Sequence, residues 1–382
     1  MSTPTPNDAD HRETLDRDLH RLSHLESATQ YVARPMIAPG IALVFIVMAG
    51  LGAAIFFGGS QTNLIVVAAA VFGAYMAINI GANDVANNMG PSVGANALTM
   101  GGAIMIAAIF ESAGALIAGG DVVSTISKGI IDPAVVATSE VFIWAMMAAL
   151  ISSALWVNLA TWVGAPVSTT HSVVGGVMGA GIAAAGFTAV NWATMSKIAA
   201  SWVISPVLGG VIAALFLALI KNRIVYQEDK IAAARKWVPI LVGIMAGAFA
   251  SYLALKGLKK IIRIDIQLAL MIGLSVGVLS WMVTIPLIRK QSVGLENRNK
   301  SLKVLFGIPL VISAGLLSFA HGANDVANAV GPLAAIVHTA EFGDFASKVS
   351  IPSWVMVIGA FGISFGLFLF GPKLIRMVGS QI

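Results

Sequence analysis

The sequence consists of long apolar segments separated by short polar ones. After a polar stretch over residues 1–36, apolar segments of about 20 residues recur, the length that a helix needs to cross roughly 30 Å of hydrocarbon. This pattern predicts an all-α polytopic membrane protein with about ten transmembrane helices. The expected spans are 38–58, 63–82, 97–119, 141–164, 172–190, 197–220, 237–257, 266–288, 302–322 and 353–375.

The distribution of charge supports a membrane protein. Charged residues make up 11% of the chain, whereas a soluble domain has roughly 25%. The formal net charge of +5 reflects Lys and Arg in the loops of such a protein, so it does not predict nucleic-acid binding. The absence of cysteine excludes disulfides, thiolate catalysis and cysteine-based metal sites.

Loop charge predicts the orientation in the membrane. Segments 221–236 and 289–303 each carry five Lys or Arg residues, and two predicted spans separate them. By the positive-inside rule both face the cytoplasm, and the count of spans then places the N-terminus there too. The basic residues between Lys256 and Arg263 fall on the opposite side and oppose this orientation. We expect a multi-pass protein of the plasma membrane, the inner membrane in a bacterium.

An eleven-residue motif occurs twice. Residues 81–91 read GANDVANNMGP and residues 322–332 read GANDVANAVGP, identical at nine of eleven positions with an offset of 241. The first copy follows a span that runs inward and the second follows one that runs outward, which predicts an inverted-topology repeat. Such repeats are typical of secondary transporters, which bind substrate and ions at broken helices or re-entrant segments between the two halves. The expected organisation is a cytosolic tail (1–36), an extra span (37–60), a first transport repeat (61–220), basic loops with connecting spans (221–303) and a second repeat (304–382).

Each copy of the motif carries oxygen ligands. Asn and Asp side chains combined with a helix break at Gly90-Pro91 suit Na⁺, or a proton carried on Asp. The alternative is that the Asn residues form interhelical hydrogen bonds and the Gly-Pro pair only kinks the helix. A buried Asp is costly in lipid, and its occurrence in both copies favours an ion site. The candidate residues are Asn83, Asp84, Asn87, Asn324, Asp325 and Asn328.

A second element, GAPVSTTHS, covers residues 164–172. Ser168, Thr169 and Thr170 offer hydroxyl groups at a predicted helix start, where backbone N–H groups also favour an anion. The alternative is an ordinary helix cap. The adjacent His171 is either a proton relay or a structural hydrogen-bond donor.

Glu111 lies within a predicted span, where a carboxylate is a functional candidate by default. It can bind the coupling ion or bond to a gating element. The alternative is a side chain that snorkels or faces a polar cavity.

The two GANDVAN motifs, FESAGALIAGGDVVSTISKGIID and GAPVSTTHSVVGGVMGAG resemble the signature segments of the inorganic phosphate transporter (PiT) family. The resemblance covers about residues 63–382. It implies phosphate uptake coupled to Na⁺ or H⁺, with sulfate as the alternative substrate of one branch, and no enzymatic cofactor. It also implies substrate binding by Ser168, Thr169, Thr170, Asn87 and Asn328, and cation coupling by Asn83, Asp84, Asn324, Asp325 and Glu111.

The sequence departs from this family at both ends. It has an added N-terminal tail and span, over residues 1 to about 58, and it lacks a second PVSTTH-like turn, which the repeat offset predicts near position 407. We therefore expect the second repeat to be truncated, either because the sequence is a fragment or because the protein is shortened and its anion site is half built.

Other function classes remain open from the sequence. No Lys or Arg lies in either GANDVAN motif or in the 164–172 segment, so burying a divalent anion there requires cations to enter with it. That favours a symporter over an ion channel, in which rings of charge are expected. A membrane hydrolase using Asp84, Asp325 and His171 is less consistent with the Asn-rich motifs. No GxxxxGK[ST] motif occurs, which favours ion gradients over ATP as the energy source.

The expected partners are phosphate or sulfate and the lipid bilayer. A homodimer is the alternative to a monomer, and no nucleic acid is expected.

Overall fold

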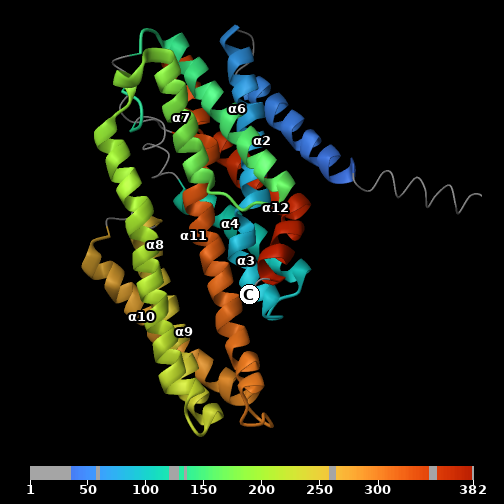
Figure 1. Ribbon diagram of the computed structural model, residues 1–382, viewed down its shortest axis with the longest axis vertical. Coiled ribbons are helices and arrows are strands. Elements are labelled where there is room, and N and C mark those ends of the chain that lie inside the picture. Colours follow the sequence, from blue (N-terminus) through green and yellow to red (C-terminus); the bar gives the residue numbers. More distant parts are fainter. Residues whose placement is uncertain are drawn as a thin grey trace, which may run out of the picture. The chain divides into compact units, whose positions relative to one another are not determined.

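Long apolar helices make up the protein, whose structure is a computed structural model (Figure 1). It describes residues 36–56, 61–119, 129–132, 136–257, 264–343 and 351–380. Within these ranges, nine helices are long and apolar enough to cross a membrane, which confirms the predicted all-α membrane fold. The chain divides into two units, Met1–Phe45 and Ile46–Ile382, and the packing and the site described below concern the second. The nine helices are Met36–Phe56, Leu64–Gly94, Met100–Ala118, Ser139–Val163, Trp192–Val225, Lys230–Lys256, Ile266–Gln291, Asn299–Phe342 and Ser353–Ser380.

The predicted span over 172–190 is instead one arm of a hairpin. Helix α7 (Thr169–Ala185) has only 17 residues and packs against α6 (Ser139–Val163). Residues 164–168 form the tip of this hairpin. Gly164 adopts a left-handed conformation (φ 82°) at the end of α6, which glycine accepts without strain. The hairpin explains why nine rather than ten helices among the described residues have the length of a span.

The helix interruption in the first motif lies at Asp84, so our prediction of a break at Gly90-Pro91 was wrong. Helix α2 (Gln61–Asn83) ends there, and α3 (Val85–Gly94) continues through Pro91. The backbone N–H of Asn87 donates to the carbonyl of Asp84, three residues back, so the turn is locally tighter than an α-helix. A proline removes only one helical N–H, and α3 packs against α12 (Ser353–Ser380) over this stretch.

The second motif lies inside one long helix. Helix α11 (Asn299–Phe342) runs for 44 residues, through both Pro309 and Pro332, and so extends well past the predicted span 302–322. The Gly331-Pro332 pair therefore does not break it. The two copies of the motif differ in backbone: the first lies at a helix junction and the second within a continuous helix.

The two repeats pack as inverted halves. Gly73 of α2 lies against Leu333 of α11, and Ser92 Oγ of α3 donates to the carbonyl of Leu310, 3.4 Å away. Residue numbers thus rise along α2 and α3 as they fall along α11, so the motif-bearing segments are antiparallel. This agrees with the inverted-topology repeat predicted from the sequence.

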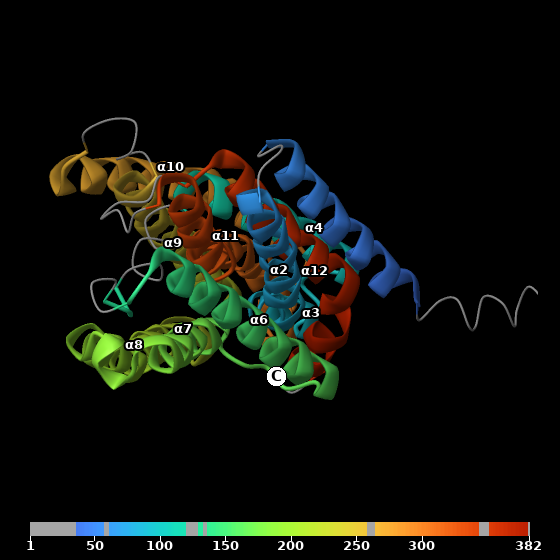
Figure 2. The ribbon, with the colours of Figure 1, turned by 90° about the horizontal axis from the view of Figure 1, so that it is seen from above.

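Paired contacts at the centre follow the same symmetry. Helix α2 packs against α12, as the view from above shows (Figure 2), and α11 packs against α4 (Met100–Ala118). Gly81 of α2 touches the backbone of Ile363, and its repeat equivalent Gly322 of α11 touches the backbone of Glu111. Where α4 meets α12, the hydroxyls of Ser112 and Ser364 are 2.7 Å apart. The apolar core is built from these four helices with α3, α6 and α7.

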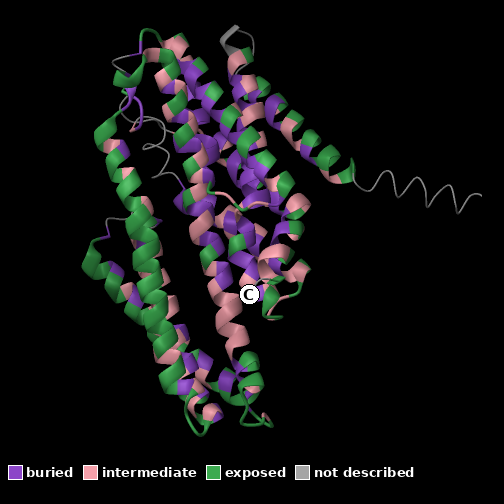
Figure 3. Ribbon diagram, in the orientation of Figure 1, coloured by how far each residue is buried: buried purple, intermediate pink, exposed green. Residues whose placement is uncertain are grey.

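The remaining helices lie outside this core. Helix α8 (Trp192–Ile220) continues into a short π-helical turn, η3 (Lys221–Val225), and is exposed along almost its whole length (Figure 3). Helices α9 (Lys230–Lys256) and α10 (Ile266–Gln291) pack closely through glycines, Gly243 and Gly247 facing Gly273 and Gly277. The exposed apolar side chains on these helices are those expected of a surface that faces lipid.

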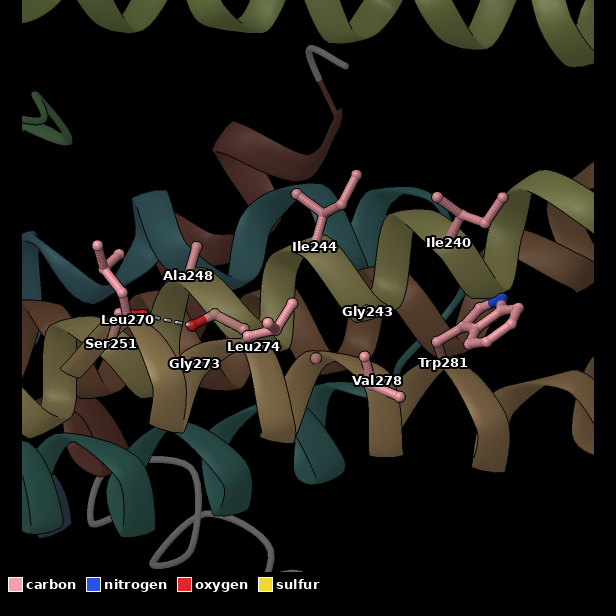
Figure 4. Close-up of a pocket in the computed structure, with 12 residues that line it drawn as sticks. Ile240, Gly243, Ile244, Ala248, Ser251, Leu270, Gly273, Leu274, Val278 and Trp281 are labelled. Atoms are coloured by element: carbon pink, nitrogen blue, oxygen red, sulfur yellow. Dashed lines mark hydrogen bonds between the residues drawn. The ribbon is translucent and has the colours of Figure 1, made fainter. Parts of the chain in front are cut away.

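A pocket of about 460 Å³ lies over the α9–α10 contact (Figure 4). Its lining is almost wholly apolar. The hydroxyl of Ser251 donates to the carbonyl of Gly247 at 3.1 Å, so this polar group already has a partner. We therefore do not assign this pocket to an ion or a polar substrate.

Candidate functional site

The carboxylates of the two motifs meet at the start of α7. Asp84, at the α2–α3 junction, accepts a hydrogen bond from Thr169 Oγ1 at 2.6 Å. Asp325, on α11, accepts one from Thr170 Oγ1 at 3.2 Å. The structure thus brings together both motif carboxylates and two of the three predicted hydroxyls.

Asn328 connects these groups to one another. Its amide nitrogen lies 2.7 Å from Asp325 Oδ1, 3.0 Å from Thr170 Oγ1 and 3.3 Å from Thr169 Oγ1. Since Asn328 follows Asp325 by three residues on α11, the two side chains share a helix face. The result is a compact cluster of carboxylate, hydroxyl and amide groups from the α2–α3 junction, α7 and α11.

Asn83 holds the tip of the hairpin in place. Its side chain is fully buried, donates to Thr161 Oγ1 (2.9 Å) and to the carbonyl of Ala165 (3.1 Å), and accepts from the N–H of Val167 (2.9 Å). These bonds satisfy the irregular backbone of the tip, which would otherwise leave polar groups unpaired in an apolar setting. Asn83 therefore positions Thr169 and Thr170 next to the carboxylates.

His321 belongs to the same cluster, and the sequence analysis missed it. Its Nδ1 lies 2.7 Å from Glu111 Oε2, and its Nε2 lies 2.7 Å from Asp325 Oδ2 and 3.7 Å from Asp84 Oδ2. The Nε2 contact with Asp325 is short but lacks the angle of a hydrogen bond. A signal for it existed: His321 directly precedes the second motif, where the first copy has Ile80, and an imidazole within an apolar span is a functional candidate.

Glu111 is fully buried on α4 and does not snorkel. Besides His321, it accepts a hydrogen bond from Asn88 Nδ2 at 3.0 Å. Its carboxylate therefore reaches the motif aspartates only through the imidazole ring.

Three carboxylates and one imidazole lie close together with little access to water. The side chains of Asp84, Asp325 and His321 are 12%, 15% and 11% exposed, and ligand atoms from all three lie within 4.8 Å of one another. Among the described residues, no Lys or Arg pairs with any of these carboxylates. Such an excess of negative charge in a low-dielectric setting attracts cations, and the oxygen donors around it suit a hard cation or a proton.

Other predicted site residues lie outside this cluster. Asn87 and Asn324 are exposed, and neither side chain forms a hydrogen bond within the described part of the chain. Ser168 caps α7, because its Oγ accepts from the N–H of His171 at 3.2 Å. The ring of His171 packs against Trp202 of α8, with centroids 4.0 Å apart.

The repeat offset pairs Asn87 with Asn328, and Asn324 with Asn83. The α6–α7 hairpin contacts the buried member of each pair and leaves the other exposed. The two repeats therefore contribute unequally to the cluster in this structure.

Comparison with known proteins agrees with this architecture. Residues 80–382 match the phosphate transporter family. A Helicobacter pylori protein named "Putative phosphate permease" is 50% identical over 370 residues, which cover 96% of this chain and 69% of that protein. The Arabidopsis thaliana protein "Inorganic phosphate transporter 2-1, chloroplastic" is 38% identical over 94% of this chain and 65% of its own length.

A solved structure is also similar. "The sodium-dependent phosphate transporter" superposes with a TM-score of 0.78 at 35% sequence identity, covering 84% of this chain and 78% of the other. The sequence match, the antiparallel motif helices and the similar structure together identify a multi-pass transporter rather than an enzyme. The chain belongs to the phosphate transporter family.

Proposed function

We propose that this protein is a secondary transporter that carries inorganic phosphate across the membrane together with a cation, Na⁺ or H⁺. One observation supports the proposal most directly: carboxylates from two antiparallel segments, Asp84 at the α2–α3 junction and Asp325 on α11, contact adjacent hydroxyls of a single hairpin. The family and the name of the similar sodium-dependent transporter support the choice of phosphate as substrate and of a co-transported ion.

Electrostatics favours coupled transport over the movement of phosphate alone. A phosphate dianion beside Asp84 and Asp325 meets like charges in a site that has little water to screen them. The cluster contains one imidazole and no Lys or Arg with which to balance them. A cation bound at the carboxylates reduces this repulsion, so the two ligands bind more favourably together than separately.

The contacts suggest how the roles are divided. In the proposal, Asp84 and Asp325 bind or neutralise the cation, with Glu111 acting through His321. In the structure the hydroxyls of Thr169 and Thr170 donate to Asp84 and Asp325. In the proposal they turn to phosphate once a cation occupies the carboxylates, and the amide of Asn328 is a further donor. These groups lie at the start of α7, where backbone N–H groups also favour an anion. Asn83 positions the hairpin. The loop charges further lead us to propose that segments 221–236 and 289–303 face the cytoplasm of a plasma membrane.

Uptake of radiolabelled phosphate into proteoliposomes tests this function. We expect an imposed inward Na⁺ gradient or an inward pH gradient to drive phosphate above its equilibrium level, and excess unlabelled phosphate to compete better than sulfate. Liposomes lacking the protein are the control. Phosphate flux that merely equilibrates and ignores both gradients contradicts coupling, and better competition by sulfate contradicts the substrate.

Substitutions at the start of α7 separate substrate binding from helix capping. We expect Thr170→Val to raise the apparent KM for phosphate at least about tenfold, because the oxyanion loses a donor worth about 1.5–3 kcal/mol. Ser168→Ala is the matched comparison. If Ser168 only caps α7, its loss costs about 1 kcal/mol of stability and leaves KM unchanged.

Initial uptake rates across a range of phosphate concentrations, measured on equal amounts of reconstituted protein, give both values of KM. An unchanged KM for Thr170→Val removes that residue from the substrate site. A raised KM for Ser168→Ala restores Ser168 to the set of substrate ligands that the resemblance implied.

A further inference from the structure

The two basic loops fold against each other into one surface. The backbone N–H of Lys230 donates to Asn297 Oδ1 at 2.9 Å, and Asn297 Nδ2 donates to the carbonyl of Glu228 at 2.6 Å. Arg235 Nε also donates to Ser292 Oγ at 2.6 Å. We call the surface formed by residues 221–236 and 289–303 the basic end. It lies where α9 and α11 begin and α10 ends, at the bottom of Figure 1.

The basic end has its own apolar core. Side chains from both loops and from the adjoining turns of α9, α10 and α11 are buried together, and Arg223 lies over the ring of Trp237, 5.5 Å from its centroid. The surface is therefore preformed in the absence of a ligand, which lowers the entropy cost of binding. The buried residues are Ile224, Ile231, Ala234, Val238, Ile288, Leu302 and Leu305.

Positive charge greatly exceeds negative charge on this surface. Ten Lys or Arg residues face three acidic ones, and nine of the ten are exposed. Two of the acidic groups are already engaged: Asp229 caps α9 through the N–H of Ala232, and Glu296 pairs with Arg298 at 2.9 Å. The basic residues are Lys221, Arg223, Lys230, Arg235, Lys236, Arg289, Lys290, Arg298, Lys300 and Lys303.

The basic end also lies at the boundary of the apolar helices. Leu287 and Val304, within a turn or two of the basic residues, are 45% and 50% exposed, and Val293 at the loop tip is 75% exposed. Exposed apolar side chains between exposed bases match the boundary between hydrocarbon and headgroups. A soluble acidic partner would satisfy the charges but would leave these apolar groups unexplained.

We propose that the basic end binds the headgroups of anionic phospholipids. Ten charges spread over the ends of several helices exceed what one phosphate ion can pair with, whereas a leaflet presents many phosphodiesters side by side. This binding does not depend on the transport function proposed above.

Lipid titration by native mass spectrometry tests the proposal on the full chain in neutral detergent. We expect phosphatidylglycerol to bind more tightly than phosphatidylcholine, and the preference to weaken as salt rises. The double variant Lys300→Gln/Lys303→Gln should lose about 5- to 25-fold in affinity for phosphatidylglycerol, since each basic residue near the surface contributes about fivefold. The matched control Lys197→Gln/Lys256→Gln removes the same charge from exposed lysines outside the basic end and should change affinity less than twofold.

Several results would overturn this assignment. Equal losses in the two double variants would mean that only net charge matters, and equal affinities for the two lipids would remove the headgroup preference. Displacement of phosphatidylglycerol by millimolar inorganic phosphate at constant ionic strength would reassign the surface to the free anion. Tighter binding of RNA or of an acidic peptide would reassign it to a soluble partner. Lipid binding by the unmodified protein, measured at increasing salt, tests the preference for phosphatidylglycerol even if a variant misfolds.

Discussion

Asp84→Asn and Asp325→Asn are each expected to lower cation-coupled phosphate uptake at least about 30-fold. Removing one charge from a buried, hydrogen-bonded charged cluster costs about 2 kcal/mol or more, which is a factor of this size. Asn retains an oxygen that can accept the hydrogen bond from Thr169 or Thr170, so the hairpin should keep its place while the negative charge is lost. Gradient-driven uptake per inserted protein measures the effect.

Asp265→Asn is the matched control for these variants. Asp265 caps α10, its carboxylate accepting from the N–H of Leu268 at 2.8 Å, and Asn is an equally good cap. Uptake by this variant should stay normal. Near-normal uptake with unchanged ion dependence in either motif variant would remove that aspartate from the coupling site.

The helices were predictable because their physical signal is strong and local. A run of about 20 apolar residues has few alternatives to spanning a bilayer. The hairpin of α6 and α7 was not distinguishable by length alone, since its second arm is as apolar as a span. Nor could hydropathy show that α11 continues through Pro332, because tolerance of a proline depends on the helices packed around it.

The candidate site was predictable in parts but not in its connections. The repeated motif predicted Asp84 and Asp325 as site residues, and a separate segment predicted Thr169 and Thr170. Only the folded structure shows that Thr169 bonds to Asp84 and Thr170 to Asp325. Packing of α6 and α7 decides that Asn83 and Asn328 are buried while Asn87 and Asn324 are exposed.

The sequence analysis missed His321 because this residue lies one position outside the repeated motif. The equivalent position in the first repeat is Ile80, so the repeat itself did not mark the position as polar. Glu111 was recognised, but its link to the motif aspartates through His321 was not. Contacts between residues 210 positions apart leave no local pattern in the sequence.

The close approach of the motif helices gives a second large effect. A Cβ at Gly322 would overlap the carbonyl oxygen of Glu111, so α11 and α4 would have to separate. We expect Gly322→Ala to destabilise the fold by about 1–3 kcal/mol or more, the usual cost of overpacking, and to pull His321 away from Glu111. Thermal unfolding of the purified protein in detergent, followed by circular dichroism, measures the loss.

Gly307→Ala on the same helix isolates the effect of the contact. A Cβ at Gly307 meets nothing within 4 Å, so this change should be neutral or stabilise the helix by up to about 1 kcal/mol, the difference in helix propensity. If helix propensity decides stability, both variants should be more stable than the unmodified protein. If the close approach of the helices decides it, Gly322→Ala should be less stable, and Gly307→Ala should be unchanged or more stable. Equal stability of the two variants would mean that α4 and α11 separate at no cost, and the contact between Glu111 and His321 would then not depend on glycine at position 322.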